Sequence, residues 1–402
     1  MSLQSERPKA VSLFSGAGGL DLGLEQAGFE VVSMVEADDD CVASLEANRG
    51  RTIACEFGPS PAFQSSKIIH RKIEAVVLKD LVPARTGEIA LLSGGPPCQP
   101  FSAAGKLRSL EDPRGNLFRH FVRLAKELRP PFILFENVQG LVTAKGPNGV
   151  PGEVLGMVCA EFERLGYGTR VALLNSADYG VPQRRVRFFL IASLHSPLPH
   201  FPEPTHSKDV SETSLFGPKE WVSLRDALGS FPVPDEGDLV RPKPDLEAEL
   251  LTLTPGTGLR TGGILEANRP GGHWGYRQDG FLADPGLPSR TIRTLPSPDW
   301  VYDDSGRLRR LTWRECATLQ GFPIDWQFVG SRSSKFKQIG NAVPAWLGRS
   351  LGVSLADAIA SLDRTSKPPG SVDYPERFVR AIKYTISENR VNGESREKRV
   401  RL

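Results

Sequence analysis

The chain has 402 residues, of which 39% are hydrophobic and 24% charged, which excludes a wholly disordered protein and leaves room for two or three domains. A formal net charge of +3 excludes a histone-like composition, although it is compatible with one basic face on the surface. No run reaches the ~20 apolar residues of a membrane helix, and no secretory signal pattern opens the chain. The five scattered cysteines and six histidines show no disulfide or zinc spacing, so we expect a cytoplasmic protein with reduced thiols and no metal.

Short apolar runs alternate with helical patterns over the first half of the chain. We expect strands at residues 10–14, 31–35, 89–93, 132–135, 170–174 and 186–192, and helices at 20–27, 40–48, 117–128 and 153–165. Asp38 or Asp39 would cap the second helix. This alternation predicts a doubly wound, Rossmann-like α/β sheet, in which ligands bind beyond the carboxyl ends of the strands.

The pattern changes near His195. Residues 196–295 hold 13 of the 33 prolines and the strand–helix rhythm stops, which predicts a smaller, loop-rich second domain over 194–336. Beyond the prolines we expect a helix at 311–319, a glycine-bearing loop at 337–344 and an apolar helix at 346–362.

The last predicted helix is too apolar to stand alone, so residues 337–362 are expected to return to the first domain, which otherwise spans residues 1–193. Residues 363–402 form a basic extension, in which ten Lys or Arg face five Asp or Glu from Arg364 onward. Such a run is typical of a solvated, partly disordered end, which we favour over an electrostatic contact with DNA. A short helix is expected within it at 378–386.

A glycine-rich turn joins the first strand to the first helix. In Phe14-Ser-Gly-Ala-Gly-Gly19, the glycines let a ligand approach the backbone at a helix N-terminus, although a simple tight turn looks the same. Glu36 and Asp38 follow the second strand, where an acid suits hydrogen bonds to a ribose. Because Asp38 is also a candidate helix cap, Glu36 is the preferred ligand of an adenosine-type cofactor.

A proline-stiffened loop, Ser93-Gly-Gly-Pro-Pro-Cys98-Gln-Pro-Phe-Ser102, follows another buried strand. Isolated cysteines are mostly small core residues, but this loop holds Cys98 at the carboxyl end of a strand, where it can meet a ligand. Glu136 ends a further strand and would face the same crevice. A thiolate and an acid beside an adenosine pocket indicate covalent addition to an electron-poor ring, assisted by protonation.

Five motifs occur in one order along the chain: FSGAGG, GGPPCQPFS, FENV, QRRVR and IGNAVP. In these motifs, over residues 10–360, the chain resembles the DNA (cytosine-5) methyltransferases of the bacterial restriction–modification type. The resemblance implies an S-adenosylmethionine-dependent methyltransferase sheet with a smaller target-recognition domain. It also implies methylation of C5 of a cytosine that is flipped out of a specific sequence of double-stranded DNA.

The resemblance assigns the chemistry to four residues. Cys98 would attack C6 of the cytosine, which makes C5 nucleophilic enough to accept the methyl group. Glu136 would hold the ring and protonate N3, while Arg185 and Arg187 would orient the base and support Glu136. Pairing of these arginines with surface acids is the alternative, which the fit to the motif disfavours.

The cofactor pocket implied by the resemblance comprises Phe14, Gly16, Gly18, Glu36, Asp80, Pro97, Leu117 and Asn341. Ala37 departs from the family, because many relatives carry a bulky apolar residue there beside the adenine. The loop 99–108 would close over the flipped base. The expected DNA contacts are Gln99, Ser102, Lys106, Arg277, Gln278, Arg290 and Arg293, and arginine and glutamine suit the edges of guanine and adenine.

Three other hypotheses fit parts of the sequence. A tRNA methyltransferase would keep the fold, but the long region between Ala192 and Arg310 favours the reading of a DNA sequence. A catalytically silent DNA-binding module would not need Cys98 and Glu136, and an NAD-dependent oxidoreductase would not need the proline–cysteine loop. We expect a monomer, since one flipped base needs one active site, and the resemblance suggests a cognate restriction endonuclease as a functional partner.

Overall fold

The computed structural model describes residues 7–53, 59–82, 88–97, 116–209, 217–229, 231–259 and 280–386. Within these ranges the main sheet has seven strands in the order β5-β2-β1-β6-β7-β10-β8. The strands are β1 (Lys9–Leu13), β2 (Glu30–Glu36), β5 (Lys67–His70), β6 (Ile89–Gly94), β7 (Phe132–Val138), β8 (Gly168–Asn175) and β10 (Val186–Ser193). β10 runs antiparallel to both of its neighbours, whereas the other neighbouring strands pair in parallel.

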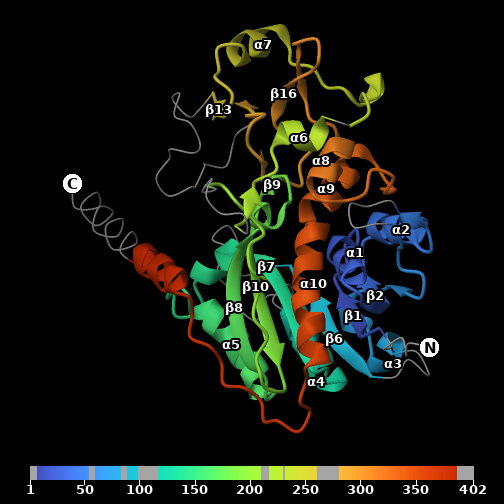
Figure 1. Ribbon diagram of the computed structural model, residues 1–402, viewed down its shortest axis with the longest axis vertical. Helices are drawn as coiled ribbons and strands as arrows, with labels where there is room; N and C mark the ends of the chain where they lie inside the picture. Colours follow the sequence, from blue (N-terminus) through green and yellow to red (C-terminus); the bar gives the residue numbers. More distant parts are fainter. Residues whose placement is uncertain are drawn as a thin grey trace.

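Helices cover both faces of this sheet (Figure 1). One face packs against α1 (Gly19–Gln26), α2 (Asp39–Asn48) and α10 (Ala345–Ala360), and the other against α3 (Leu78–Leu81), α4 (Asn116–Leu128) and α5 (Glu153–Arg164). Successive strand residues alternate between the two faces, as Ala10 and Val11 do. The predicted doubly wound, Rossmann-like fold is therefore confirmed. None of the described helices combines the length and apolar character needed to cross a membrane.

The helices α1 and α10 cross with their backbones in contact. A methyl group added at Gly23 would overlap the carbonyl oxygen of Ala345 and lie 2.5 Å from the backbone nitrogen of Arg349. One added at Gly352 would lie 2.6 Å from the Cβ of Ala27. Glycines therefore let α10 fix the position of the helix that follows the glycine-rich turn, and the apolar last helix packs against the first strands and helices of the chain.

Replacing Gly23 by alanine tests this contact. Because backbone atoms on α10 cannot move aside as a flexible side chain can, we expect Gly23→Ala to lower the free energy of unfolding by about 1–3 kcal/mol. The matched control is Gly156→Ala in α5, where an added methyl group meets no described atom within 4 Å. Alanine should be neutral or stabilise there by up to about 1 kcal/mol. Equal urea midpoints for the two variants would contradict the close contact.

A second lobe, the upper part of Figure 1, is built from short elements. Its four-stranded sheet and two helices are β13 (Thr257–Gly258), β14 (Phe281–Leu282), β16 (Trp300–Tyr302), β17 (Leu308–Arg310), α6 (Leu224–Leu228) and α7 (Pro244–Leu250). α8 (Trp313–Leu319) and α9 (Arg332–Asn341) share the hydrophobic cluster of α1, so the core continues from one lobe into the other. The remaining short strands are β3 (Thr52–Ile53), β4 (Ser60–Pro61), β9 (Gln183–Arg184), β11 (His206–Ser207), β12 (Lys219–Glu220) and β15 (Ser289–Arg290).

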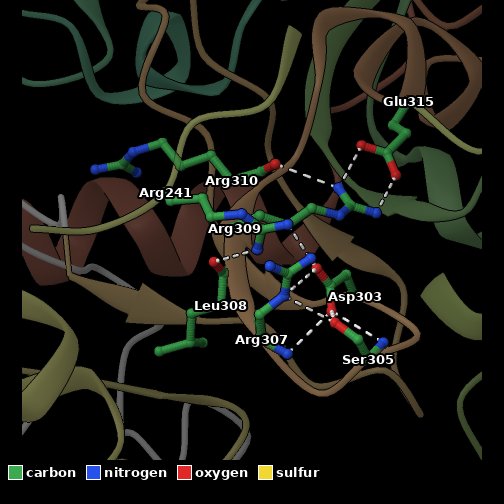
Figure 2. A network of polar contacts seen from close by, with 8 residues as sticks. All are labelled: Arg241, Asp303, Ser305, Arg307, Leu308, Arg309, Arg310 and Glu315. Atoms are coloured by element: carbon green, nitrogen blue, oxygen red, sulfur yellow. Dashed lines mark hydrogen bonds and ion pairs between the residues drawn. The ribbon is translucent and has the colours of Figure 1, made fainter. Parts of the chain in front are cut away.

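Figure 2 shows the polar network that supports β17 and α8. Arg309 forms a bidentate pair with Glu315, with nitrogen–oxygen distances of 2.8 and 2.9 Å, and both side chains are nearly excluded from solvent. Glu315 also closes the capping box of α8 with Thr312. Asp303 accepts hydrogen bonds from its own turn and from Arg241, which fixes the loop between β16 and β17. The network is structural and lies in the second lobe.

One expected loop is a helix. Residues 337–344 were predicted to form a glycine-bearing loop, whereas α9 runs from Arg332 to Asn341 and Ser331 caps its start. Gly340 is required for a close approach, because an added methyl group would lie 2.5 Å from the carbonyl carbon of Arg293. The prediction was wrong because a glycine that makes room for another segment looks, in sequence, like one that breaks a helix.

The first part of the basic tail also differs from expectation. The amide of Val372 donates to the carbonyl of Thr169 on β8 at 2.9 Å, so the tail returns to the sheet. Phe378 is fully buried, with its ring centroid 6.2 Å from that of Phe188. Residues 376–386 are helical, close to the predicted helix. Residues 363–386 are thus not a wholly solvated end, whereas residues 387–402 lie outside the described residues.

Candidate active site

In the glycine-rich turn after β1, the space beside Gly16 is open, whereas the space beside Gly18 is filled by other side chains. Phe14 has a φ of 59°, which is strained for a residue with a side chain, and Gly16 and Gly18 have φ values of 56° and 82°. A methyl group at Gly18 would lie 2.8 Å from Leu45, so this glycine serves packing. One at Gly16 would meet no described atom within 4 Å. The turn is therefore open to a ligand at Gly16.

Glu36 ends β2 directly opposite this turn. One carboxylate oxygen accepts the amide of Gly16 at 2.7 Å, and the other accepts the amides of Ala37 and Asp38 at 2.7 and 2.8 Å. Asp38 caps α2 through Cys41, as expected, and binds Lys337 at 2.8 Å. The side chain of Glu36 is half-buried, so its carboxylate is held in one orientation and still reaches solvent.

Asp80 lies beside the same carboxyl edge. Its carboxylate accepts hydrogen bonds from the amide of Val77 at 3.2 Å and from Arg71 at 2.9 Å, and these hold its pKa below the usual range. The amide of Arg71 in turn donates to the carbonyl of Glu36 at 3.0 Å. The structure therefore brings Asp80, Glu36 and the glycine-rich turn together.

The start of the proline–cysteine loop is fixed to β7. The side chain of Asn137 donates to the carbonyl of Pro96 at 3.1 Å. A methyl group at Gly95 would lie 2.5 Å from a carboxylate oxygen of Glu136, so only glycine allows this approach. Pro97 is exposed and is the last described residue before Cys98, which lies outside the described residues.

Glu136 and Arg187 form an ion pair across β7 and β10. The Nε of Arg187 lies 3.4 Å from Oε1 of Glu136, and the two side chains are 15% and 13% exposed. Burial raises the pKa of Glu136, while the charges of Arg187 and Arg185 oppose that rise. The result is a carboxyl group that keeps its proton at higher pH than an exposed glutamate does.

Arg185 does not contact Glu136 in the way that the sequence suggested. It is buried, and its two terminal nitrogens donate to the carbonyls of Ile292 at 3.1 Å and Gly340 at 2.7 Å. It acts on Glu136 only through its charge. The guanidinium joins β10 to α9 and to the segment after β15, so we interpret it as a positioning residue.

Comparisons with known proteins are consistent along nearly the whole chain. The family profile of the C-5 cytosine-specific DNA methylases matches residues 9–356. The chain belongs to this family. It is 31% identical to the Type II methyltransferase M1.HphI of Haemophilus parahaemolyticus, in an alignment that covers 88% of this chain and 87% of the relative. It is also 31% identical to the Type II methyltransferase M.FnuDI of Fusobacterium nucleatum, in an alignment that covers 89% of this chain and 97% of the relative. A putative DNA modification methyltransferase encoded within an E. coli prophage shares the fold, with a TM-score of 0.60, 22% identity and coverage of 88% and 99%.

The methylase family uses S-adenosylmethionine to methylate C5 of cytosine in DNA, and this is the activity of the chain. The residues present fit that cofactor. The turn has space at Gly16, where an approaching ligand meets no side chain. Glu36 at the end of β2 and Asp80 in α3 offer two fixed carboxylates at the same edge of the sheet, which suits the hydroxyl and amino groups of an adenosine.

The other predicted cofactor residues are more widely placed. Leu117 is half-buried in the cluster under α4, Pro97 is exposed beyond β6, and Asn341 is exposed at the end of α9. All three lie on elements that reach the carboxyl edge of the sheet.

The predicted DNA contacts divide into two groups. Arg290 lies in β15, where it forms a bidentate pair with Asp299 and stacks on Phe281 with 3.6 Å between its guanidinium carbon and the ring centroid. That side chain is 14% exposed, so contact with a base would first require breaking the pair. Arg293 has one terminal nitrogen that is buried without a hydrogen bond among the described residues. The other predicted contacts, Gln99, Ser102, Lys106, Arg277 and Gln278, lie outside the described residues.

The sequence interpretation missed two supporting residues in motifs that it had found. Asn137 follows Glu136 in FENV, and Gly95 belongs to GGPPCQPFS. Their motif positions were visible, but the hydrogen bond to Pro96 and the close approach to Glu136 depend on β6 lying beside β7. Parallel pairing of strands that are far apart in sequence is not visible in a local pattern.

Gly95→Ala tests how closely the methylase depends on the position of Glu136. The added methyl group forces the carboxylate to shift, so we expect kcat for methyl transfer to fall roughly 100-fold, with little change in the affinity for S-adenosylmethionine. Gly140→Ala is the matched control, because an added methyl group there meets no described atom within 4 Å. Methyl transfer by Gly95→Ala at the rate of the control would show that Glu136 tolerates displacement.

Proposed function

We propose that the enzyme methylates a cytosine in a specific double-stranded DNA sequence through covalent catalysis by Cys98. The observation that supports this best is the buried pair of Glu136 and Arg187, which lies beside the start of the loop that carries Cys98. The thiolate sulfur bonds to C6, and the displaced ring electrons make C5 nucleophilic. Bound S-adenosylmethionine supplies the methyl group. A base then removes the C5 proton, and the C6–S bond breaks to restore the thiolate.

Glu136 holds the ring and protonates N3 when the thiolate adds. Because burial raises its pKa, the carboxyl is protonated at higher pH than an exposed glutamate would be, which suits a proton donor. Arg187 limits this rise and keeps the carboxyl in one orientation. Arg185 contributes by holding the segment after β15 and the end of α9 in place.

The cofactor lies across the carboxyl ends of β1, β2 and β6. Glu36 binds the ribose hydroxyls, Asp80 contacts the adenine, and Phe14 packs on its ring. Gly16 and Gly18 shape the turn that receives the methionine end. Pro97, Leu117 and Asn341 complete the pocket from the neighbouring loop and helices.

The second lobe, residues 194–336, reads the DNA sequence. Flipping the target nucleotide costs a few kcal/mol, and chemistry at C5 requires it because a stacked base is not accessible. Gln99, Ser102 and Lys106 hold the phosphates as the loop closes, and Arg277, Gln278 and Arg293 contact bases or backbone. We leave Arg290 out of this set, because its pair with Asp299 supports the lobe itself.

The enzyme works as a monomer in the cytoplasm, on bacterial DNA. The Type II names of its relatives support a restriction–modification context, with a cognate endonuclease that cuts the same sequence when it is unmethylated. The size of the second lobe and the DNA-acting relatives favour DNA over tRNA as the substrate.

Labelled S-adenosylmethionine distinguishes these substrates. We expect label to enter mixed-sequence duplex DNA as 5-methylcytosine and not total tRNA. Sequencing of the unconverted cytosines after bisulfite treatment would then identify the recognition sequence. Label in tRNA alone would keep the chemistry and overturn the substrate.

Three variants test the assigned roles. Cys98→Ala should abolish transfer, and Glu136→Gln should lower kcat by roughly 10²–10⁴-fold, because the amide cannot donate a proton to N3 as an acid does. Cys159→Ala is the matched control, since this thiol lies buried in α5 and should be dispensable.

DNA with 5-fluorocytosine at the target should trap wild-type enzyme covalently, because fluorine cannot leave as a proton does. Trapping by Cys98→Ala would contradict the nucleophile.

A further inference from the structure

A carboxyl group without a partner lies behind the glycine-rich turn. Asp21, in the first turn of α1, is fully buried, and neither of its oxygens has a hydrogen-bond partner among the described residues. The neighbouring hydroxyls of Ser12 and Ser15 are bonded to each other at 3.0 Å. A buried polar group without a partner is expensive and uncommon, so its retention needs an explanation.

The surroundings of Asp21 favour its neutral form. Burial is the main cause, and the negative charge of Glu36 adds to it, while the nearby hydroxyls of Ser12 and Ser15 and the backbone amide of Asp21 itself, none of which forms a well-aligned hydrogen bond with the carboxyl group, oppose it; together they raise the pKa of Asp21 to about 7. Burial raises the pKa of Glu25, one turn further along α1, to about 7, and the charge of Asp21 adds to that rise. Glu25 differs from Asp21 because it accepts the amide of Phe63 at 2.7 Å.

The position of Asp21 connects it to the cofactor. Ser15 belongs to the turn whose glycine, Gly16, has open space beside it. Glu36, whose charge acts on Asp21, is also the residue assigned to the ribose. A positive charge that enters this pocket would therefore act on both carboxylates, of which Asp21 is fully buried and Glu36 reaches solvent.

We propose that Asp21 is a positioning residue whose protonation follows the charge of the cofactor: near neutral pH a part of the free enzyme carries a proton on Asp21, and this proton is released to solvent when the cationic S-adenosylmethionine binds. This rests on the proposed cofactor site. The product, S-adenosylhomocysteine, is a neutral thioether at the same sulfur, so it does not stabilise the carboxylate. The site then holds the substrate more tightly than the product, and the difference grows with pH.

Titration calorimetry in buffers of different ionisation enthalpy measures how many protons the enzyme releases when the cofactor binds. At pH 7 we expect about half a proton to be released per S-adenosylmethionine bound, because half of the Asp21 side chains then carry one. Sinefungin, whose amine replaces the sulfonium with another cation, should behave alike, and S-adenosylhomocysteine should release none. From pH 6 to pH 7.5 the affinity for S-adenosylmethionine relative to S-adenosylhomocysteine should rise about eightfold.

Two isosteric variants assign the proton to its residue. Asp21→Asn should bind S-adenosylmethionine without proton release, and its preference over S-adenosylhomocysteine should not change with pH. Glu25→Gln, the matched control on the same helix, should retain the release. Equal release with S-adenosylhomocysteine, retained release by Asp21→Asn, or binding to wild type without release would each overturn the inference. Absence of any binding would instead overturn the cofactor site itself.

The stability of the cofactor-free protein gives a second measurement. Since the folded state raises the pKa of Asp21 above its ordinary value of 3.8, its contribution to stability is full below that pH and is lost as the pH rises towards 7. Asp21→Asn should therefore melt several degrees above wild type at pH 8, and the difference should shrink steadily as the pH falls towards 4. A lower melting temperature for Asp21→Asn at pH 8 would show that the carboxylate has a stabilising partner.

Discussion

The buried guanidinium of Arg185 connects the two lobes. It bonds to the carbonyls of Ile292 and Gly340, so one side chain on the sheet fixes a segment of the second lobe and the end of α9 at once. Removing a charge from water is costly, and two carbonyls repay only part of that cost. The arrangement is stable because Gln183, also buried, donates to the carbonyl of Leu319 and accepts the amide of Ile292. The relative placement of the two lobes therefore depends on strands β9 and β10.

Three carboxyl groups at the same end of the sheet meet three different environments. Glu36 accepts three backbone amides, which fixes its orientation without a counter-ion. Glu136 has Arg187, which limits the effect of burial on its pKa. Asp21 has neither, and its pKa rises to about 7. One sheet edge thus holds a carboxylate that is fixed as an acceptor and two carboxyl groups whose pKa burial raises, and the partners of each set the difference.

The sequence predicted the main sheet well, because most of its strands are short apolar runs, and α2 begins at a clear cap, Asp38. Its motifs pointed to residues that have contacts at the candidate site: Glu36 meets Gly16, and Glu136 meets Arg187. It did not predict α9, since the role of Gly340 depends on a segment far away in the chain. Nor did it predict the partners of Arg185, because a motif shows which residue is present and not which carbonyls it will reach.

The returning tail has a consequence for association between molecules. β8 is the last strand of its sheet, and an uncovered last strand presents free amides and carbonyls to which another chain can add. Val372 donates to Thr169 on this strand, and Phe378 covers the apolar face beside it. Residues 363–386 therefore cover part of the exposed edge of β8. In a shortened chain that ends after α10, this edge would be free to pair with a strand of another molecule, which would promote aggregation.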